Sequence, residues 1–337
     1  MKKFNFFFKC ILACLPILAV ILFTAFVPYG YMDSEYPAWD YTKNVCKDVS
    51  NIYPKDGPVS ALGNANPTLI LGDSRAMADL IPSMMGDELT VNLAVGGATS
   101  IEMYYTLNTY IKNNTVPEKV IIMFAPFHYS VIDNFWTRAA YFNYLSIPDL
   151  YDLYGYAKAA QSETLTKNGY MNDLLSYRLR FPDKYIPALM NSKFIGRYSS
   201  NKEEYYNVAM DLGYGEFGTA NGDYAWNYEV SYDRMHTSGD AVLLDIYMNR
   251  LLNLCEDNGI ETIVAVPPMN EVSYYALKEA YVDDFSSYMY GLKIKHPAIT
   301  IDGDIPCYLN EYFGDPSHLN HKGAMVFTED FVSSHLK

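Results

Sequence analysis

The sequence predicts an α/β fold with a mainly parallel sheet of about five strands and helices on both faces. From Pro67 onward, short apolar runs suited to buried strands alternate with helical stretches. The chain of 337 residues is 50% hydrophobic, so it can bury a sizeable core. The clearest helix runs from about Asp240 to Asn258, with Ser238 or Asp240 near its cap and Gly259 just past its end. The strand candidates are Thr68–Leu71, Thr90–Leu93, Lys119–Ala125, Glu261–Val266 and Ala298–Ile301.

An uncharged stretch of 23 residues lies between Lys9 and Asp33. As a helix it would measure roughly 34 Å, enough to cross the core of a bilayer. Lysines precede it and acidic residues follow it, so the positive-inside rule predicts a single-pass protein with a cytoplasmic N-terminus. Residues 1–32 are therefore expected to form a cytoplasmic tip and a transmembrane signal-anchor helix, with the rest of the chain outside the cell membrane.

Two alternatives to an anchor fit the sequence less well. A cleaved signal peptide needs small residues at the cut, and Phe23-Thr24-Ala25 fits this poorly. The residues up to Cys14 look like a lipoprotein site, but a further apolar run follows the cysteine. The sequence favours the anchor over both.

The part expected outside the membrane is strongly acidic. The chain has a net charge of −14, and without the three lysines of residues 1–32 the remainder carries −17. Such a surface repels nucleic acid and anionic headgroups, so no nucleic-acid partner is predicted. Outside the anchor lie Cys46, Cys255 and Cys307, an odd number without metal spacing. A disulfide framework is not indicated, and at most one bridge can form.

Two segments lack the strand and helix alternation. Residues 33–66 are rich in Tyr, Pro, Asp and Asn, and we expect an extracytoplasmic stalk or wrap before a domain at 67–337. Residues 129–239, an insertion in that domain, hold 16 of the 32 tyrosines. The insertion would lie beside the site, where aromatic faces suit sugar rings as a lid or platform. The alternative is ordinary tyrosine packing in core and surface.

Ser74 follows Gly72 and Asp73 where the first strand ends and a helical pattern begins. At such a turn its hydroxyl faces solvent, and the free N–H groups of the helix start favour negative charge beside it. This is a suitable place for a nucleophile. The alternative is that Asp73 and Ser74 only cap the helix.

Asp315 and His318 lie on one turn near the C-terminus, just before the last helical pattern. A serine hydroxyl needs a base to take its proton, and the base needs an acceptor that holds its tautomer. His318 and Asp315 supply these two groups. Since sites in parallel sheets form beyond the carboxyl ends of strands, we expect this turn to meet Ser74.

Gly-Asp-Ser after the first strand and Asp-x-x-His before the last helix, taken together, resemble the SGNH/GDSL family of esterases and acyltransferases. The resemblance implies a flavodoxin-like three-layer fold and no cofactor. It also implies Ser74 as nucleophile, His318 as base and Asp315 as the residue that orients His318. Four further residues are expected to line the site: Asp73, Arg75, Asn92 and His128.

The second strand leads into a turn with two glycines, Gly96 and Gly97. Glycines at a strand end let the backbone approach another group and aim an N–H into a cleft. By resemblance, Asn92 and Gly97 match the second block of the family, where the glycine N–H joins that of Ser74 in the oxyanion hole. A simple tight turn is the alternative.

The third block departs from the family pattern, which has Gly-x-Asn-Asp after the third strand. Here the sequence at 124–129 is Phe-Ala-Pro-Phe-His-Tyr, without the asparagine that completes the oxyanion hole. Losing one such donor typically costs about 3 kcal/mol. Three explanations stay open: a group such as His128 replaces it, the enzyme acts slowly on a tethered substrate, or catalysis is lost. Similar departures occur in membrane-anchored teichoic acid D-alanylation and alginate O-acetylation proteins, which favours the second.

Asp315, His318 and His321 were also considered as metal ligands, but this spacing is loose and no metal is predicted. The sequence thus predicts a serine esterase or O-acyltransferase acting outside the membrane on acyl esters of a cell-envelope glycan or teichoic acid. The resemblance implies a bacterial envelope protein with a membrane-bound acyltransferase as partner and donor. The rival hypothesis is a non-catalytic scaffold or binding module in envelope polymer assembly.

Overall fold

Five parallel strands form the central sheet, in the order β2-β1-β3-β4-β6. They belong to a computed structural model that describes residues 2–26, 33–49, 52–86, 89–179, 190, 197–217 and 232–336. All five strand predictions are confirmed, with ends shifted by one or two residues. The order is that of flavodoxin-like doubly wound sheets. The strands are β1 Thr68–Gly72, β2 Thr90–Asn92, β3 Lys119–Met123, β4 Glu261–Ala265 and β6 Thr300–Ile301.

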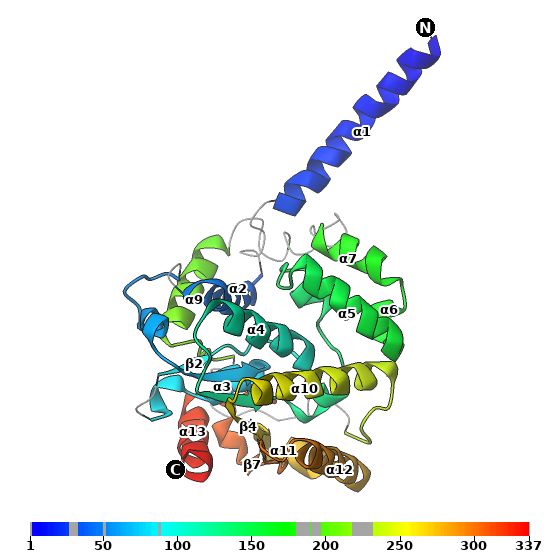
Figure 1. The fold of residues 1–337 in the computed structure, drawn as a ribbon. Coiled ribbons are helices and arrows are strands. Elements are labelled where there is room, and N and C mark those ends of the chain that lie inside the picture. The colour runs from blue at the N-terminus through cyan, green and yellow to red at the C-terminus, as the bar shows by residue number, and fades with distance from the viewer. Residues whose placement is uncertain are drawn as a thin grey trace.

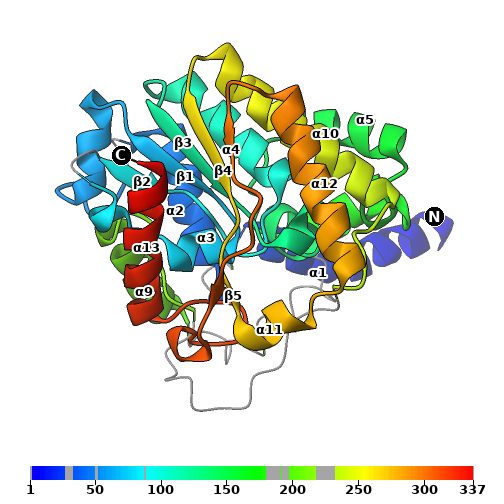
Figure 2. The ribbon, with the colours of Figure 1, turned by 90° about the horizontal axis from the view of Figure 1, so that it is seen from below.

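Helices cover both faces of the sheet, which gives the domain three layers (Figure 1). On one face α4 and α10 pack against each other, and α2 packs on α4. On the other face lie α12 and α13, and α13 packs against α3 (Figure 2). The helices after α1 are α2 Tyr36–Lys47, α3 Ser74–Asp79, α4 Ser100–Asn113, α5 Ile147–Ala160, α6 Glu163–Thr166, α7 Tyr170–Arg178, α9 Tyr198–Met210, α10 Gly239–Asp257, α11 Glu271–Ala276, α12 Glu279–Lys295 and α13 His321–His335.

The predicted helix at 240–258 is confirmed as α10. The Ser238 side chain accepts a hydrogen bond from the Ala241 N–H and caps its start. Gly259, just past its end, has φ +66°, a conformation that glycine adopts without strain. The buried face of α10 holds α4 in place, where Ser100 Oγ donates to the Leu244 carbonyl (2.9 Å). This contact fixes the helix that begins next to the two glycines at 96 and 97.

The expectation of a stalk at 33–66 is corrected by the packing of this segment. α2 packs against both α4 and α9, and its Trp39, Tyr41 and Val45 are each at most 1% exposed. Thr42 Oγ1 also donates to the Leu93 carbonyl at the end of β2 (3.4 Å). The segment is a wrap that completes the core of the domain, because its aromatic residues cover a helix layer that would otherwise face water.

The insertion at 129–239 is mainly helical where it is described, and it contains α5, α6, α7 and α9. Tyr144, Tyr170 and Tyr205 are buried in the core, whereas Tyr151 is 78% exposed. The described tyrosines thus include ordinary core and surface residues. The rest of the insertion, at 180–189, 191–196 and 218–231, lies outside the described residues, and so does part of the predicted lid or platform.

The N-terminal helix α1, Lys2–Phe26, extends away from the domain (Figure 1). Its side chains at 6–19 are all exposed. Within the described part of the chain, no helix is both long enough and apolar enough to span a membrane. The end of the predicted anchor, at 27–32, lies outside the described residues.

A second, two-stranded parallel sheet was not predicted. It pairs β5, Met269–Asn270, with β7, Cys307–Tyr308, in parallel. Cys307 is exposed there, and all five cysteines of the chain are free thiols. The remaining short elements are the 3-10 turns η3 Pro58–Asn64, η4 Pro82–Met84, η5 Pro126–Tyr129 and η7 Asn310–Tyr312, and the π turn η6 Trp136–Ala140.

Candidate active site

The turn at 72–74 has no room for a side chain at its first residue. A β-carbon on Gly72 would lie 1.9 Å from the Met123 carbonyl oxygen of β3 and 2.6 Å from the Ala76 β-carbon. Asp73 follows as the N-cap of α3, and its Oδ1 accepts the Arg75 N–H (2.9 Å). The small glycine and the capping aspartate place Ser74 as the first residue of α3, at the carboxyl end of β1.

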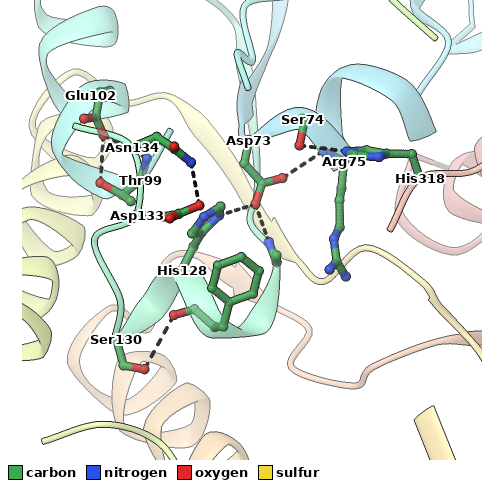
Figure 3. Close-up of polar contacts among 12 residues, drawn as sticks. Asp73, Ser74, Arg75, Thr99, Glu102, His128, Ser130, Asp133, Asn134 and His318 are labelled. Carbon is green, nitrogen blue, oxygen red and sulfur yellow. Dashed lines mark hydrogen bonds and ion pairs between the residues drawn. The ribbon is translucent and has the colours of Figure 1, made fainter. Parts of the chain in front are cut away.

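Ser74, His318 and Asp315 lie within hydrogen-bond distance of one another. Ser74 Oγ is 2.8 Å from His318 Nε2 (Figure 3). On the other side of the ring, His318 Nδ1 is 2.8 Å from Asp315 Oδ2 and 3.0 Å from Oδ1. A carboxylate only accepts, so Nδ1 carries the proton and Nε2 is left to accept the Ser74 hydroxyl proton. The predicted meeting of the two turns is therefore present.

Asp315 keeps its negative charge in this arrangement. Burial raises the pKa of the Asp315 carboxyl, but hydrogen bonds from the His318 ring and the backbone N–H groups of Ser317 and His318 outweigh burial and leave the pKa below its usual value. Phe217 stacks on the His318 ring at 4.6 Å between centroids. The imidazole is thus fixed in orientation from two sides.

Two buried polar residues hold the His318 turn. Asp79, at the end of α3, accepts the Leu319 N–H at Oδ1 (3.1 Å). Asn270, fully buried at the start of α11, donates to the Pro316 carbonyl (2.5 Å). Neither residue was predicted: Asp79 belongs to no catalytic motif although it lies on the same helix as Ser74, and Asn270 is far from both Ser74 and His318 in the sequence. Both residues position His318 through hydrogen bonds to the backbone of its turn.

Replacing Asp79 by asparagine is expected to stabilise the fold increasingly as pH rises above about 4. Burial raises the pKa of Asp79 well above its usual value. Between the unfolded and folded pKa values, the unfolded carboxyl has lost its proton while the folded one keeps it. The wild-type free energy of unfolding then falls with pH, by at most about 1.4 kcal/mol per unit. Asparagine still accepts the Leu319 N–H and does not titrate.

Urea unfolding of both proteins between pH 4 and pH 8 measures this difference. Asp284→Asn is the control, because the hydrogen bond with Arg234 lowers the pKa of Asp284 and the sign is opposite. Equal pH slopes for the wild type and Asp79→Asn would contradict the expected ionisation of Asp79.

Asn92 and Gly97 shape the chain at the end of β2 and the loop that follows it. Asn92 is fully buried, donates to the Ala76 carbonyl (2.8 Å) and accepts the Ala94 N–H (3.0 Å). It thereby ties this loop to α3. Gly97 has φ +69°, and α4 begins beyond it with a capping box between Thr99 and Glu102.

Asp73 and His128 form a buried pair beneath the nucleophile turn. Asp73 Oδ2 is 2.6 Å from His128 Nδ1 and accepts the Ala125 N–H (2.7 Å), as Figure 3 shows. Burial raises the pKa of Asp73, but its bonds to His128 and the charge of Arg75 bring the pKa below the usual value. His128 Nε2 is buried and has no partner among the described residues.

Four residues are predicted to line the site, and all of them are at most 5% exposed in the structure: Asp73, Arg75, Asn92 and His128. The motifs locate these residues in the chain, but whether each side chain is buried depends on packing that short motifs do not encode. Because Nδ1 of His128 is bound to Asp73, only Nε2 of this ring is left to take the place of the missing asparagine.

A different pair of donors covers the glycine loop. A β-carbon on Gly97 would lie 2.5 Å from Arg138 Nη1 and 2.7 Å from Asn134 Nδ2, so both side chains press against this glycine. The other guanidinium nitrogen, Nη2, binds Glu35 Oε1 (2.5 Å). Asn134 Nδ2 donates one of its two N–H groups to Asp133 (2.5 Å). Arg138 Nη1 approaches Gly97 slightly more closely and carries a positive charge, so it is the stronger donor over the loop.

Glu35 binds Arg138 and also interacts with the charge of His318. Burial raises the pKa of Glu35, and the nearby charges of Arg138 and His318 offset this only in part. Arg138 comes from the insertion and Glu35 from the segment before α2. No sequence pattern indicates this pair, because the two residues are 103 positions apart and belong to no motif.

His321 lies apart from the Ser74 site and binds Glu216 through Nδ1 (3.0 Å). In the part of the chain that the structure describes, no group of three His, Cys, Asp or Glu side chains could hold a metal ion. In comparisons with known proteins, no family model matches the chain, and no curated protein matches it.

Proposed function

We propose that the protein is an SGNH/GDSL-type serine esterase or O-acyltransferase that acts outside the membrane on acyl esters of a cell-envelope polysaccharide or teichoic acid. The observation that carries this proposal is the 2.8 Å contact between Ser74 Oγ and His318 Nε2. Asp315 Oδ2 lies 2.8 Å from Nδ1, the other nitrogen of the His318 ring. The two turns are 244 residues apart, and their meeting supports a shared proton.

The reaction would proceed in two acyl transfers. Ser74 Oγ attacks the ester carbonyl carbon while His318 Nε2 takes the hydroxyl proton. The tetrahedral intermediate collapses, the C–O bond to the alcohol breaks, and His318 returns the proton to the leaving oxygen. Water or a sugar hydroxyl then attacks the acyl-Ser74 ester with the same help from His318. The choice between these two nucleophiles separates an esterase from an O-acyltransferase.

The oxyanion would be held by the N–H groups of Ser74 and Gly97 and by Arg138 Nη1. This third donor replaces the asparagine that is missing from the turn at 124–129. Support comes from the close approach of Arg138 to Gly97 and from the bond to Glu35, which fixes the guanidinium. A cationic donor also favours the negative charge more strongly than a neutral amide.

The membrane location is part of the same proposal. It rests on the uncharged stretch between Lys9 and Asp33 and on the exposure of the α1 side chains at 6–19. An anchor would keep the site close to the membrane and raise its effective concentration for a membrane-bound acyltransferase that supplies the acyl donor. A single-pass topology would leave residues 1–9 in the cytoplasm.

A serine-reactive fluorophosphonate tests the enzyme and its location together. Membranes from cells that express the full chain are washed with alkaline carbonate, labelled with the probe and analysed in parallel with Ser74→Ala. We expect labelling of the wild type in the washed membranes and none of Ser74→Ala. His236→Gln, which changes a histidine with no place in the site, is the control and should label normally.

An unlabelled wild type would favour the rival function, a non-catalytic scaffold or binding module in envelope assembly. The absent asparagine is the observation that favours this rival. Release of a labelled protein by the carbonate wash would contradict the anchor and leave the enzyme proposal intact.

A further inference from the structure

A cavity of about 680 Å³ lies away from the Ser74 site. Its walls come from α2, α4, the chain at 143–149 and the end of α7. Small-molecule sites in proteins typically measure about 300–1,000 Å³. None of its lining residues belongs to the Ser74 site, so the cavity needs an explanation of its own.

The lining of this cavity is basic in an acidic protein. It contains Lys43, Lys47, Lys112 and Arg178 but a single acidic residue, Asp149. The Asp149 carboxylate is already engaged by the N–H and hydroxyl of Ser146 (3.1 and 2.5 Å). The whole chain carries −14, so this concentration of cations is a local exception to the repulsion of anions predicted from composition.

The two inner cations are held by backbone carbonyls. Lys43 Nζ donates to the Asn143 carbonyl (2.5 Å), and Arg178 Nη1 donates to the Leu145 carbonyl (3.1 Å). Both side chains are half-buried, while Lys47 and Lys112 are exposed at the rim. Asp40, which is also on α2, interacts electrostatically with Lys43 and Lys47. Asp40 does not line the cavity.

Among the residues that the structure describes, Arg178 is a partly buried cation without a carboxylate partner. Within the described residues, no salt bridge joins Arg178, Lys47 or Lys112 to an acidic side chain. Burial lowers the pKa of Arg178, which is the direction expected for a cation that lacks a counter-ion. An anion in the cavity would remove this penalty.

We propose that this cavity binds the phosphate group of a phosphate ester. A phosphate group offers several charged oxygens, and it can accept from Arg178 and the lysines at once, as arginine forks and lysine ammonium groups do in phosphate sites. Two sources share this chemistry, the headgroup of an anionic lipid and a water-soluble polyol phosphate. Figure 1 places α2 and α7 on the side of the domain from which α1 leaves.

The test uses the full chain in a neutral detergent and two probes. The first is glycerol 1-phosphate, titrated by calorimetry, and the second is phosphatidylglycerol added to the micelles, with phosphatidylcholine as the neutral comparison, followed by native mass spectrometry. Lys112→Gln combined with Arg178→Gln is expected to weaken binding about tenfold or more, since each removes a hydrogen bond to a charged group. The Lys112→Gln variant alone, at an exposed position, should weaken it less.

The matched control is Arg234→Gln combined with Lys295→Gln, which removes the same charge from exposed pairs elsewhere. It should bind as the wild type does. Binding of glycerol 1-phosphate alone would identify a soluble ligand, and retention of phosphatidylglycerol alone would identify a lipid headgroup. The proposal would be overturned if the wild type bound neither probe. It would also be overturned if the control variant lost as much affinity as Lys112→Gln combined with Arg178→Gln.

Discussion

Replacing His318 by glutamine is expected to slow labelling of Ser74 by about four to six orders of magnitude. Glutamine fits a similar volume but cannot take the Ser74 hydroxyl proton, and without the imidazole the hydroxyl remains a weak nucleophile. The 2.8 Å contact between Ser74 Oγ and His318 Nε2 makes this histidine the base that serves Ser74. The measurement is the second-order rate constant for the fluorophosphonate, with thermal unfolding to verify that the variant is folded.

His321→Gln is the matched control for this experiment. His321 begins α13, three residues after His318, and its side chain is 59% exposed beside Glu216. Its replacement should leave the labelling rate within about twofold, because surface substitutions of this kind change little. Similar losses in both variants would mean that the effect arises from the turn and not from a proton transfer by His318.

Replacing Arg138 by glutamine is expected to lower the labelling rate by about two to three orders of magnitude. The guanidinium lies against Gly97, where it would stabilise the negative oxygen of the transition state. The loss should appear in the maximal rate of inactivation and not in the binding of the probe, because the donor acts on charge that develops during the reaction. Arg138→Lys should recover part of the rate.

Two further variants separate catalysis from structure. Glu35→Gln keeps the contact to Arg138 but removes its charge, so a smaller loss is expected. Arg234→Gln, from an exposed ion pair with Asp284, should leave the rate unchanged. A normal rate for Arg138→Gln alongside a labelled wild type would contradict the role of Arg138 while leaving Ser74 and His318 as proposed.

The sheet and the contact between Ser74 and His318 could be predicted because their signals are local. Each strand is a short apolar run, and each turn carries a small motif at a strand end or before a helix. The parallel sheet then brings the ends of its strands to one edge, so two motifs far apart in the sequence meet there. Local patterns combined with this one rule of topology were sufficient.

The donor over Gly97 could not be predicted for the opposite reason. Arg138 lies in an insertion without periodicity, and Glu35 lies in a segment that reads as a stalk. Their contact depends on how α2 and η6 pack on the domain, which no short pattern encodes. The burial of Asn92 and His128 was missed for a similar reason, since a polar residue near a motif can equally face the site or support it from beneath.

The packing of α2 decides which shortened forms of this protein can be studied in solution. A form that starts at Pro67 would keep every strand and the histidine turn, yet it would expose the surface that Trp39 and Tyr41 now cover. It would also leave Arg138 without its carboxylate. Recombinant material intended for crystallisation or kinetics should therefore begin no later than Asp33, and an inactive shorter fragment would say nothing about the activity of the full chain.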